Sequence, residues 1–128
     1  MPPASSMPAP ESYSRAVEYM IDGQEMTVRQ LWDYGPEQEM FYSPFICEAD
    51  PLPETGNVLI TDGGRIRDEV GQQSGEIVGG QHWARVVEVT GSAQSEKVFE
   101  IIVDSAPGAE DIGWAVYRSE RLTSLYPE

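Results

Sequence analysis

The sequence has little of several residue types that common functional sites require. A single cysteine among 128 residues excludes an internal disulfide, and a single histidine leaves no second imidazole for a zinc-type site. Eight basic residues against 22 acidic ones give a net charge of −14, which would repel nucleic acid and anionic membrane surfaces. No apolar run approaches the ~20 residues that span a bilayer. The composition therefore excludes a disulfide scaffold, a coiled coil, a basic nucleic-acid binder and a membrane protein, and it argues against a zinc-type site.

The chain is long enough for one domain, and its ends differ in composition. Four prolines fall within residues 1–10, which lack both the basic and the apolar region of a signal peptide. Residues 1–11 are therefore predicted to be an extended, proline-rich tail. Hydrophobic residues make up 40% of the chain and are spread along it, so residues 12–128 are expected to form one folded domain.

Short apolar and aromatic segments separated by turn residues predict a nearly all-β protein. No segment keeps a 3.6-residue apolar period over ten residues. Residues 63–80 are polar and rich in glycine, and they are expected to form a long loop, whereas residues 51–57 are expected to form a turn. The expected strands are residues 14–22, 26–34, 40–48, 58–61, 82–90 and 97–104, followed by a last strand with its tail at 114–126.

An internal repeat supports the all-β interpretation. Residues 15–19 align with residues 85–89, and residues 27–31 align with residues 97–101, both at an offset of 70. A constant offset indicates one supersecondary unit used twice. Repeat folds need about three or more units, so fewer than two units here suggest part of a larger assembly.

Several blocks, held in order, resemble the C-terminal portion of bacterial arylsulfate sulfotransferases. This resemblance implies an all-β fold in which antiparallel sheets form a partial β-propeller, made of the last blade and flanking strands, one of which helps to close the ring. It also implies a periplasmic location and no cofactor. The blocks are residues 13–19, 26–28, 31–35, 41–44, 56–63 and 117–121.

The activity that the resemblance implies is transfer of a sulfuryl group from an aryl sulfate to a phenol through a covalently modified histidine. Such a reaction needs a nucleophile and cationic or hydrogen-bonding groups aimed at the developing charge. The resemblance gives His82 no catalytic role, so no catalytic residue is assigned, and the isolated chain is expected to be inactive. Phenolic and aryl sulfate molecules are the expected partners if the missing blades are present.

Four residues are candidates for the wall of the substrate pocket. The resemblance places Tyr117 near the pocket, where its phenol could bind a sulfate oxygen or stack on an aryl ring. Arg118 should face the side of the strand opposite to Tyr117. A structural ion pair is the interpretation that competes with a pocket role for Arg118. Tyr42 is more often a core residue. The resemblance places a threonine of the family's pocket wall near the position of Ile46, and an isoleucine side chain cannot form the hydrogen bond that a threonine could.

Three further features have plain structural interpretations. His82 fits the start of a strand beside Trp83, and a lone histidine is an improbable metal ligand. Cys47 is expected to be a buried thiol. Residues 62–69 could form an anion-binding nest or a weak calcium loop, but a solvated loop is the simpler expectation.

Two other functions remain open from the sequence. A non-enzymatic β-sheet module could bind ligands or proteins, and its open sheet edges could pair two copies. The chain could also be a gene fragment with no role of its own.

Overall fold

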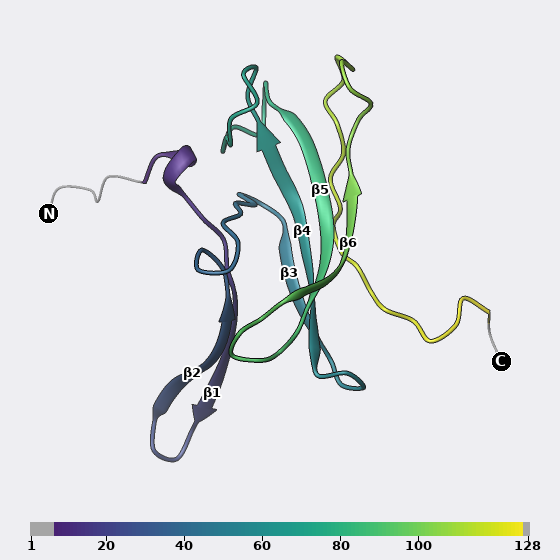
Figure 1. Ribbon diagram of the computed structural model, residues 1–128. Coiled ribbons are helices and arrows are strands. Elements are labelled where there is room, and N and C mark those ends of the chain that lie inside the picture. Colours follow the sequence, from purple (N-terminus) through teal and green to yellow (C-terminus); the bar gives the residue numbers. More distant parts are fainter. Residues whose placement is uncertain (1–6, 127–128) are drawn as a thin grey trace, which may run out of the picture.

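The computed structural model describes residues 7–126, which form two antiparallel sheets (Figure 1). Strands β1 (Ala16–Asp22) and β2 (Thr27–Tyr34) form a hairpin, and a four-stranded sheet contains β3 (Cys47–Leu52), β4 (Asn57–Arg67), β5 (Gln81–Val89) and β6 (Lys97–Val103). A short 3-10 turn, η1 (Ala9–Glu11), precedes β1. In the described part of the chain, no helix has the length and apolarity needed to cross a membrane. The all-β prediction is confirmed.

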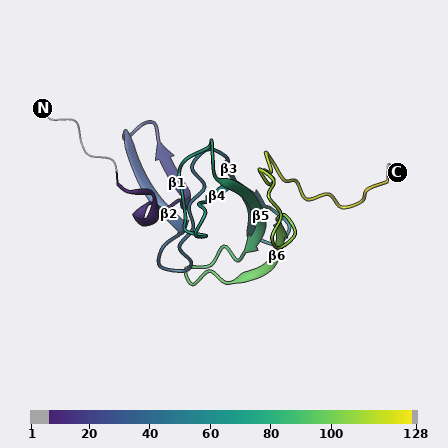
Figure 2. The same ribbon diagram turned by 90° about the horizontal axis from the view of Figure 1, so that it is seen from above.

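The four-stranded sheet is a meander in which every strand pairs antiparallel with the next along the chain. Radial sheets of this kind are the blades of β-propellers. Seen from above, the sheet curves, and over residues 7–126 it does not close on itself (Figure 2). The partial propeller therefore stays a prediction.

The repeat seen in the sequence corresponds to two related hairpins, β1–β2 and β5–β6. In each hairpin the register shifts at matching positions, between Glu18 and Tyr19 in the first and between Glu88 and Val89 in the second. The first strands therefore match at the predicted offset of 70. The second strands match at 67, because Glu18 pairs with Trp32 and Glu88 pairs with Phe99. The constant offset was wrong for the second strand, because 13 residues separate Glu18 from Trp32 whereas 10 separate Glu88 from Phe99.

The core lies where the base of the β1–β2 hairpin packs on one face of the four-stranded sheet. Both sheets and the loop after β2 contribute to it, and the Trp32 indole N–H extends the contact by donating to Ser95 Oγ at 2.8 Å. The tip of the hairpin projects away from this core (Figure 1). The buried cluster is Ala16, Tyr34, Phe41, Ile60, Val87 and Val89, with Trp32 and Val58 packed against it.

Three predicted boundaries were wrong in the middle of the chain. Residues 63–67 belong to β4 and not to a loop, because a bulge absorbs the glycines and pairing resumes beyond it, which buries Ile66. Of predicted strand 40–48, only Cys47 and Glu48 lie in a strand, while Phe41 forms an isolated bridge with Ser14. Pro51, expected in a turn, lies in β3, an edge strand that tolerates its missing N–H.

The ends of the chain also depart from expectation. Residues 114–126 form no strand; instead, the segment after β6 joins the sheet through a parallel bridge between His82 and Gly113. In the predicted tail, residues 9–11 form the turn η1 instead of extended chain. The rest of the tail prediction falls largely on residues 1–6, which lie outside the described residues.

Candidate functional site

A bulge in β4 is the point where three separate segments of the chain meet. The register of β4 against β5 shifts around Gly63 and Gly64. The Gly63 N–H donates to the carbonyl of Ile46 at 3.1 Å, and the Gly63 carbonyl accepts from the N–H of Val116 at 3.0 Å. Bulges recur next to active sites because they re-aim the chain. We call this place the Gly63 crossing, formed by residues 43–46, 62–65 and 112–118.

The two glycines are needed because the segments approach too closely for side chains. A Cβ on Gly63 would lie 1.9 Å from the carbonyl oxygen of Val116, and a Cβ on Gly64 would lie 2.8 Å from the ring of Phe45. Neither distance permits a side chain without displacement of a neighbour. Glycine at positions 63 and 64 therefore permits the three segments to approach this closely.

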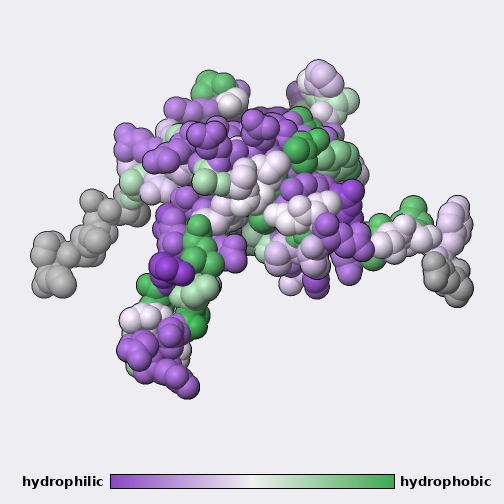
Figure 3. Space-filling model, turned by 60° about the horizontal axis from the view of Figure 1, so that its bottom comes forward, coloured by the Kyte–Doolittle hydropathy of each residue, from purple (hydrophilic) through white to green (hydrophobic). Residues whose placement is uncertain are grey.

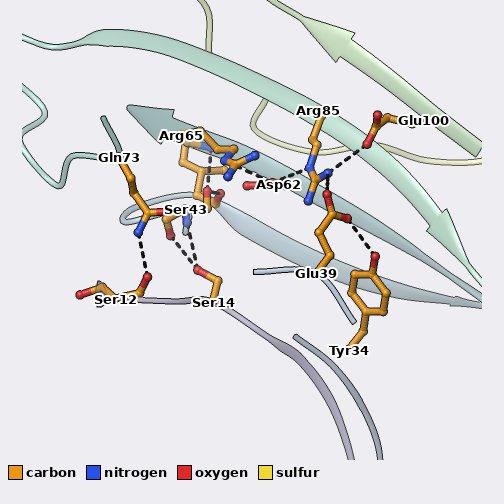
Figure 4. Close-up of polar contacts among 12 residues, drawn as sticks. Ser12, Ser14, Tyr34, Glu39, Ser43, Asp62, Arg65, Gln73, Arg85 and Glu100 are labelled. Carbon is orange, nitrogen blue, oxygen red and sulfur yellow. Dashed lines mark hydrogen bonds and ion pairs between the residues drawn. The ribbon is translucent and has the colours of Figure 1, made fainter. Parts of the chain in front are cut away.

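Ser43 ties the crossing to the chain ahead of β1. Its buried hydroxyl accepts from the Gly64 N–H at 2.8 Å and donates to the Ile46 carbonyl. The N–H of Ser43 donates to Ser14 Oγ at 3.0 Å (Figure 4). Sequence reasoning assigned Ser43 no role, and its position beside Pro44 was the only available signal.

The segments of the crossing contain three of the four predicted pocket residues. Ile46 is half-buried and contacts Gly63, while Tyr117 follows the Val116 contact directly and is 82% exposed. Arg118 forms an ion pair with Glu48 of β3 at 3.4 Å. Both Ile46 and Tyr117 are therefore near one point, whereas Arg118 is engaged by a carboxylate.

Tyr42 lies apart from the other candidates. It is half-buried, and its hydroxyl lies 3.5 Å from the place that a Cβ on Gly75 would take. Its ring is thus directed to the loop between β4 and β5.

His82 lies at the start of β5, as predicted, and holds several segments together. Its backbone N–H donates to Ile112 and its carbonyl accepts from Trp114, at 2.8 and 3.1 Å. Ring atom Nε2 lies 2.8 Å from the Ile77 carbonyl, and the ring packs edge-on against Phe45. Because a carbonyl only accepts, Nε2 carries the hydrogen and donates it. Nowhere in residues 7–126 do three His, Cys, Asp or Glu side chains gather as a metal site would require.

Cys47 was predicted to be buried, and this was wrong. It begins β3, the edge strand of the sheet, and is exposed. Partial desolvation of the thiol and, to a lesser extent, the charge of Asp62 raise the pKa of Cys47 to about 11. The thiol is therefore a poor nucleophile at neutral pH.

Next to the crossing lies an ion network centred on Arg85 of β5, in which the side chains of Arg85 and Asp62 are buried (Figure 4). Its Nε donates to Asp62 Oδ2 at 2.8 Å, and its Nη1 donates to Glu39 Oε1 and Glu100 Oε2 at 2.6 and 2.9 Å. Lys97 bonds Glu100 at 2.8 Å. The network joins β4, β5, β6 and the loop after β2.

Burial and charge shift the acidities within this network. Burial raises the pKa of Asp62, although the cations Arg65 and Arg85 oppose the shift. Burial also acts to raise the pKa of Glu39, but hydrogen bonds and charge from Arg85 outweigh it and lower the pKa. Burial and the hydrogen bond to Glu39 raise the pKa of Tyr34 to about 12.

The network neutralises its own cations. The Arg65 guanidinium lies 4.2 Å from the centre of the Trp83 ring and 3.7 Å from Asp62 Oδ2. Asp62 Oδ1 is buried and has no hydrogen-bond partner among residues 7–126. The solvated loop expected at residues 62–69, in preference to an anion nest or a calcium loop, is instead mostly strand β4. This arrangement links β4, β5 and β6 around the crossing.

Comparisons with known proteins give a consistent assignment. The family model described as Arylsulfotransferase (ASST) matches residues 2–117. Arylsulfate sulfotransferase AssT of Escherichia coli O6:H1 (strain CFT073) is 44% identical over 62 residues, which are 47% of this chain. The chain spans about 10% of the length of that relative. No solved structure matches the chain.

Proposed function

The chain belongs to the arylsulfotransferase (ASST) family, and on this premise we propose that it forms one wall of the substrate pocket of a sulfuryl-transfer enzyme. The Gly63 crossing is the observation that carries the proposal. It gathers Ile46 and the exposed Tyr117 around a glycine bulge, on segments that the sequence resemblance relates to the pocket. The four-stranded sheet would be the last blade of a propeller.

The reaction would use a histidine on a polypeptide segment other than this chain. That nitrogen attacks sulfur, an N–S bond forms, and the S–O bond to the aryl group breaks as a proton reaches the leaving phenolate. A second phenol then attacks sulfur, its O–S bond forms as the N–S bond breaks, and the phenol gives up its proton, which regenerates the histidine. The resemblance gives His82 no such role, and its Nε2–H donates to the Ile77 carbonyl.

Within this scheme, Tyr117 has the most direct role. Its phenol is exposed, and the part of the chain that the structure describes makes no hydrogen bond to it, so it can donate to a sulfate oxygen or stack on the aryl ring. Ile46 contributes apolar wall. Tyr42 and Arg118 are the weaker candidates, because Tyr42 faces a loop and Arg118 pairs with Glu48. The proposed location is the periplasm.

The test combines this chain with the matched relative. Purified residues 1–128 should release no nitrophenol from 4-nitrophenyl sulfate with phenol as acceptor. Replacing the matching 62-residue stretch of E. coli AssT with the stretch from this chain should preserve transfer. Turnover by the isolated chain, or a folded chimera without activity, would contradict the proposal.

A non-enzymatic module that pairs through its edges is the alternative function. The edge strand β6 exposes Val98, Phe99, Ile101 and Ile102 to between 47 and 57%. Such a module would form a stable dimer by strand addition. Light scattering that shows a monomer at all concentrations argues against it.

A further inference from the structure

The two hairpins match in register, but their first strands differ in the number of strands that pair with them. Strand β5 pairs with β6 on one edge and with β4 on the other. Its counterpart β1 pairs with β2 only, and over the described residues no strand lies along its second edge. Just ahead of β1, Ser14 makes a single isolated bridge to Phe41. The edge of Ala16–Asp22 therefore presents unpaired backbone groups, which invite another strand.

Burial follows the same contrast. Val87 and Val89 of β5 are 1% and 0% exposed, and both sit in the core. Tyr19, which corresponds to Val89, is 51% exposed, and Ile21 beyond it is 74% exposed. Figure 3 shows apolar side chains along the projecting hairpin, with hydrophilic residues at its tip. Beyond its base, the first hairpin thus carries apolar side chains like those of the second hairpin, but no other element of the described residues buries them.

The ion pairs of the two hairpins differ in the same way. Arg85 binds Glu100 across its own hairpin, and Arg15 binds Asp33 across the matching hairpin, at 2.9 and 3.6 Å. Arg85 also receives Asp62 from the neighbouring strand β4 at 2.8 Å. Arg15 has no such second carboxylate among residues 7–126, and its side chain is 41% exposed.

We propose that the free edge of β1 is a docking site for one further antiparallel strand that places a carboxylate opposite Arg15. The strand resembles β4 in its apolar alternation. In the register of the second hairpin, the position equivalent to Ile60 faces Val17, and the position equivalent to Asp62 faces Arg15. The source of the strand rests on the proposed function: it is a segment of an arylsulfotransferase polypeptide outside residues 1–128.

The experiment supplies such a strand within the same molecule. A copy of the β4 sequence, residues 57–67, is joined ahead of Met1 through a flexible Gly-Ser linker, which gives an effective concentration in the mM range. Amide hydrogen exchange across β1 should slow at least tenfold relative to a chain carrying the scrambled strand. Arg15→Glu should remove that protection. Asp62→Arg in the appended copy should then restore it.

Matched controls separate this result from general effects. Arg29→Glu makes the same charge change on exposed β2 and should leave the protection intact. Protection of the β1 amides that is the same with and without Arg15→Glu, or no protection at all, overturns the proposal. Concentration-dependent protection without the appended strand overturns it as well, because a second copy would then be the occupant. Amide hydrogen exchange is measured without a sulfuryl-transfer assay, so failure of this proposal can be distinguished from failure of the proposed function.

Discussion

Replacing Arg85 with methionine should destabilise the fold strongly. The side chain of Arg85 is 5% exposed and donates hydrogen bonds to three carboxylates at 2.6 to 2.9 Å. Methionine keeps the apolar stem but removes every donor. Asp62, whose side chain is fully buried, would keep only Arg65 at 3.7 Å. One of its oxygens already lacks a partner among residues 7–126.

The magnitude follows from the uncompensated carboxylate. Breaking a buried ion pair by removing one partner costs about 3–5 kcal/mol. Domains of this size have a free energy of unfolding of roughly 5–15 kcal/mol. With a urea m-value of about 2 kcal/mol/M, the midpoint should fall by roughly 2 M. Urea unfolding followed by circular dichroism measures this shift.

A double-mutant cycle tests the cause. In an Asp62→Asn background, Arg85→Met should cost at least about 1 kcal/mol less, because the fully buried carboxylate that would lose its partner is already absent. Arg85→Lys retains a charge in case Arg85→Met does not fold, and it should be intermediate because lysine cannot reach three carboxylates. A loss below about 1 kcal/mol for Arg85→Met, or full additivity in the cycle, would refute the reasoning.

Three further results are expected. Gly63→Ala should cost about 1–3 kcal/mol and speed proteolysis of the C-terminal segment, because its Cβ would meet a carbonyl oxygen at 1.9 Å, whereas Gly23→Ala, with nothing within 4 Å, should change little. Iodoacetamide should modify Cys47 at pH 8 roughly 100-fold more slowly in the folded chain than in urea, since its pKa is raised to about 11; equal rates would contradict the shift. Glu39 has a folded-state pKa below the unfolded value of 4.5, so its stabilisation is complete above pH 4.5 and is lost as the pH falls through the folded-state value. Glu39→Gln should therefore lose less stability than the wild type between pH 7 and pH 3, as read from urea midpoints.

Sequence reasoning located the hairpins but not the bulge. Residues 82–90 and 97–104 alternate and carry β-branched side chains, and they form β5 and β6 nearly as expected. The glycines at 63 and 64 signalled a loop because glycine favours turns. Only the partner segments show that those glycines permit close approach inside a strand. Local chemistry could not reveal that long-range contact.

The site was predictable only in part. Ile46 and Tyr117 came from resemblance, and the structure places their segments together at Gly63. Arg85 and Asp62 are 23 residues apart in sequence and carry no motif. Their pairing depends on the register of β4 against β5, which alternation alone does not set.

The path of the C-terminal segment has a consequence for how the protein is made. Residues 112–121 lie across a sheet whose strands end at Val103, with contacts at Gly63, Thr61 and Glu88. A ribosome therefore delivers all four strands before the segment that covers them. During that interval the uncovered face is open to chaperones and to other nascent chains.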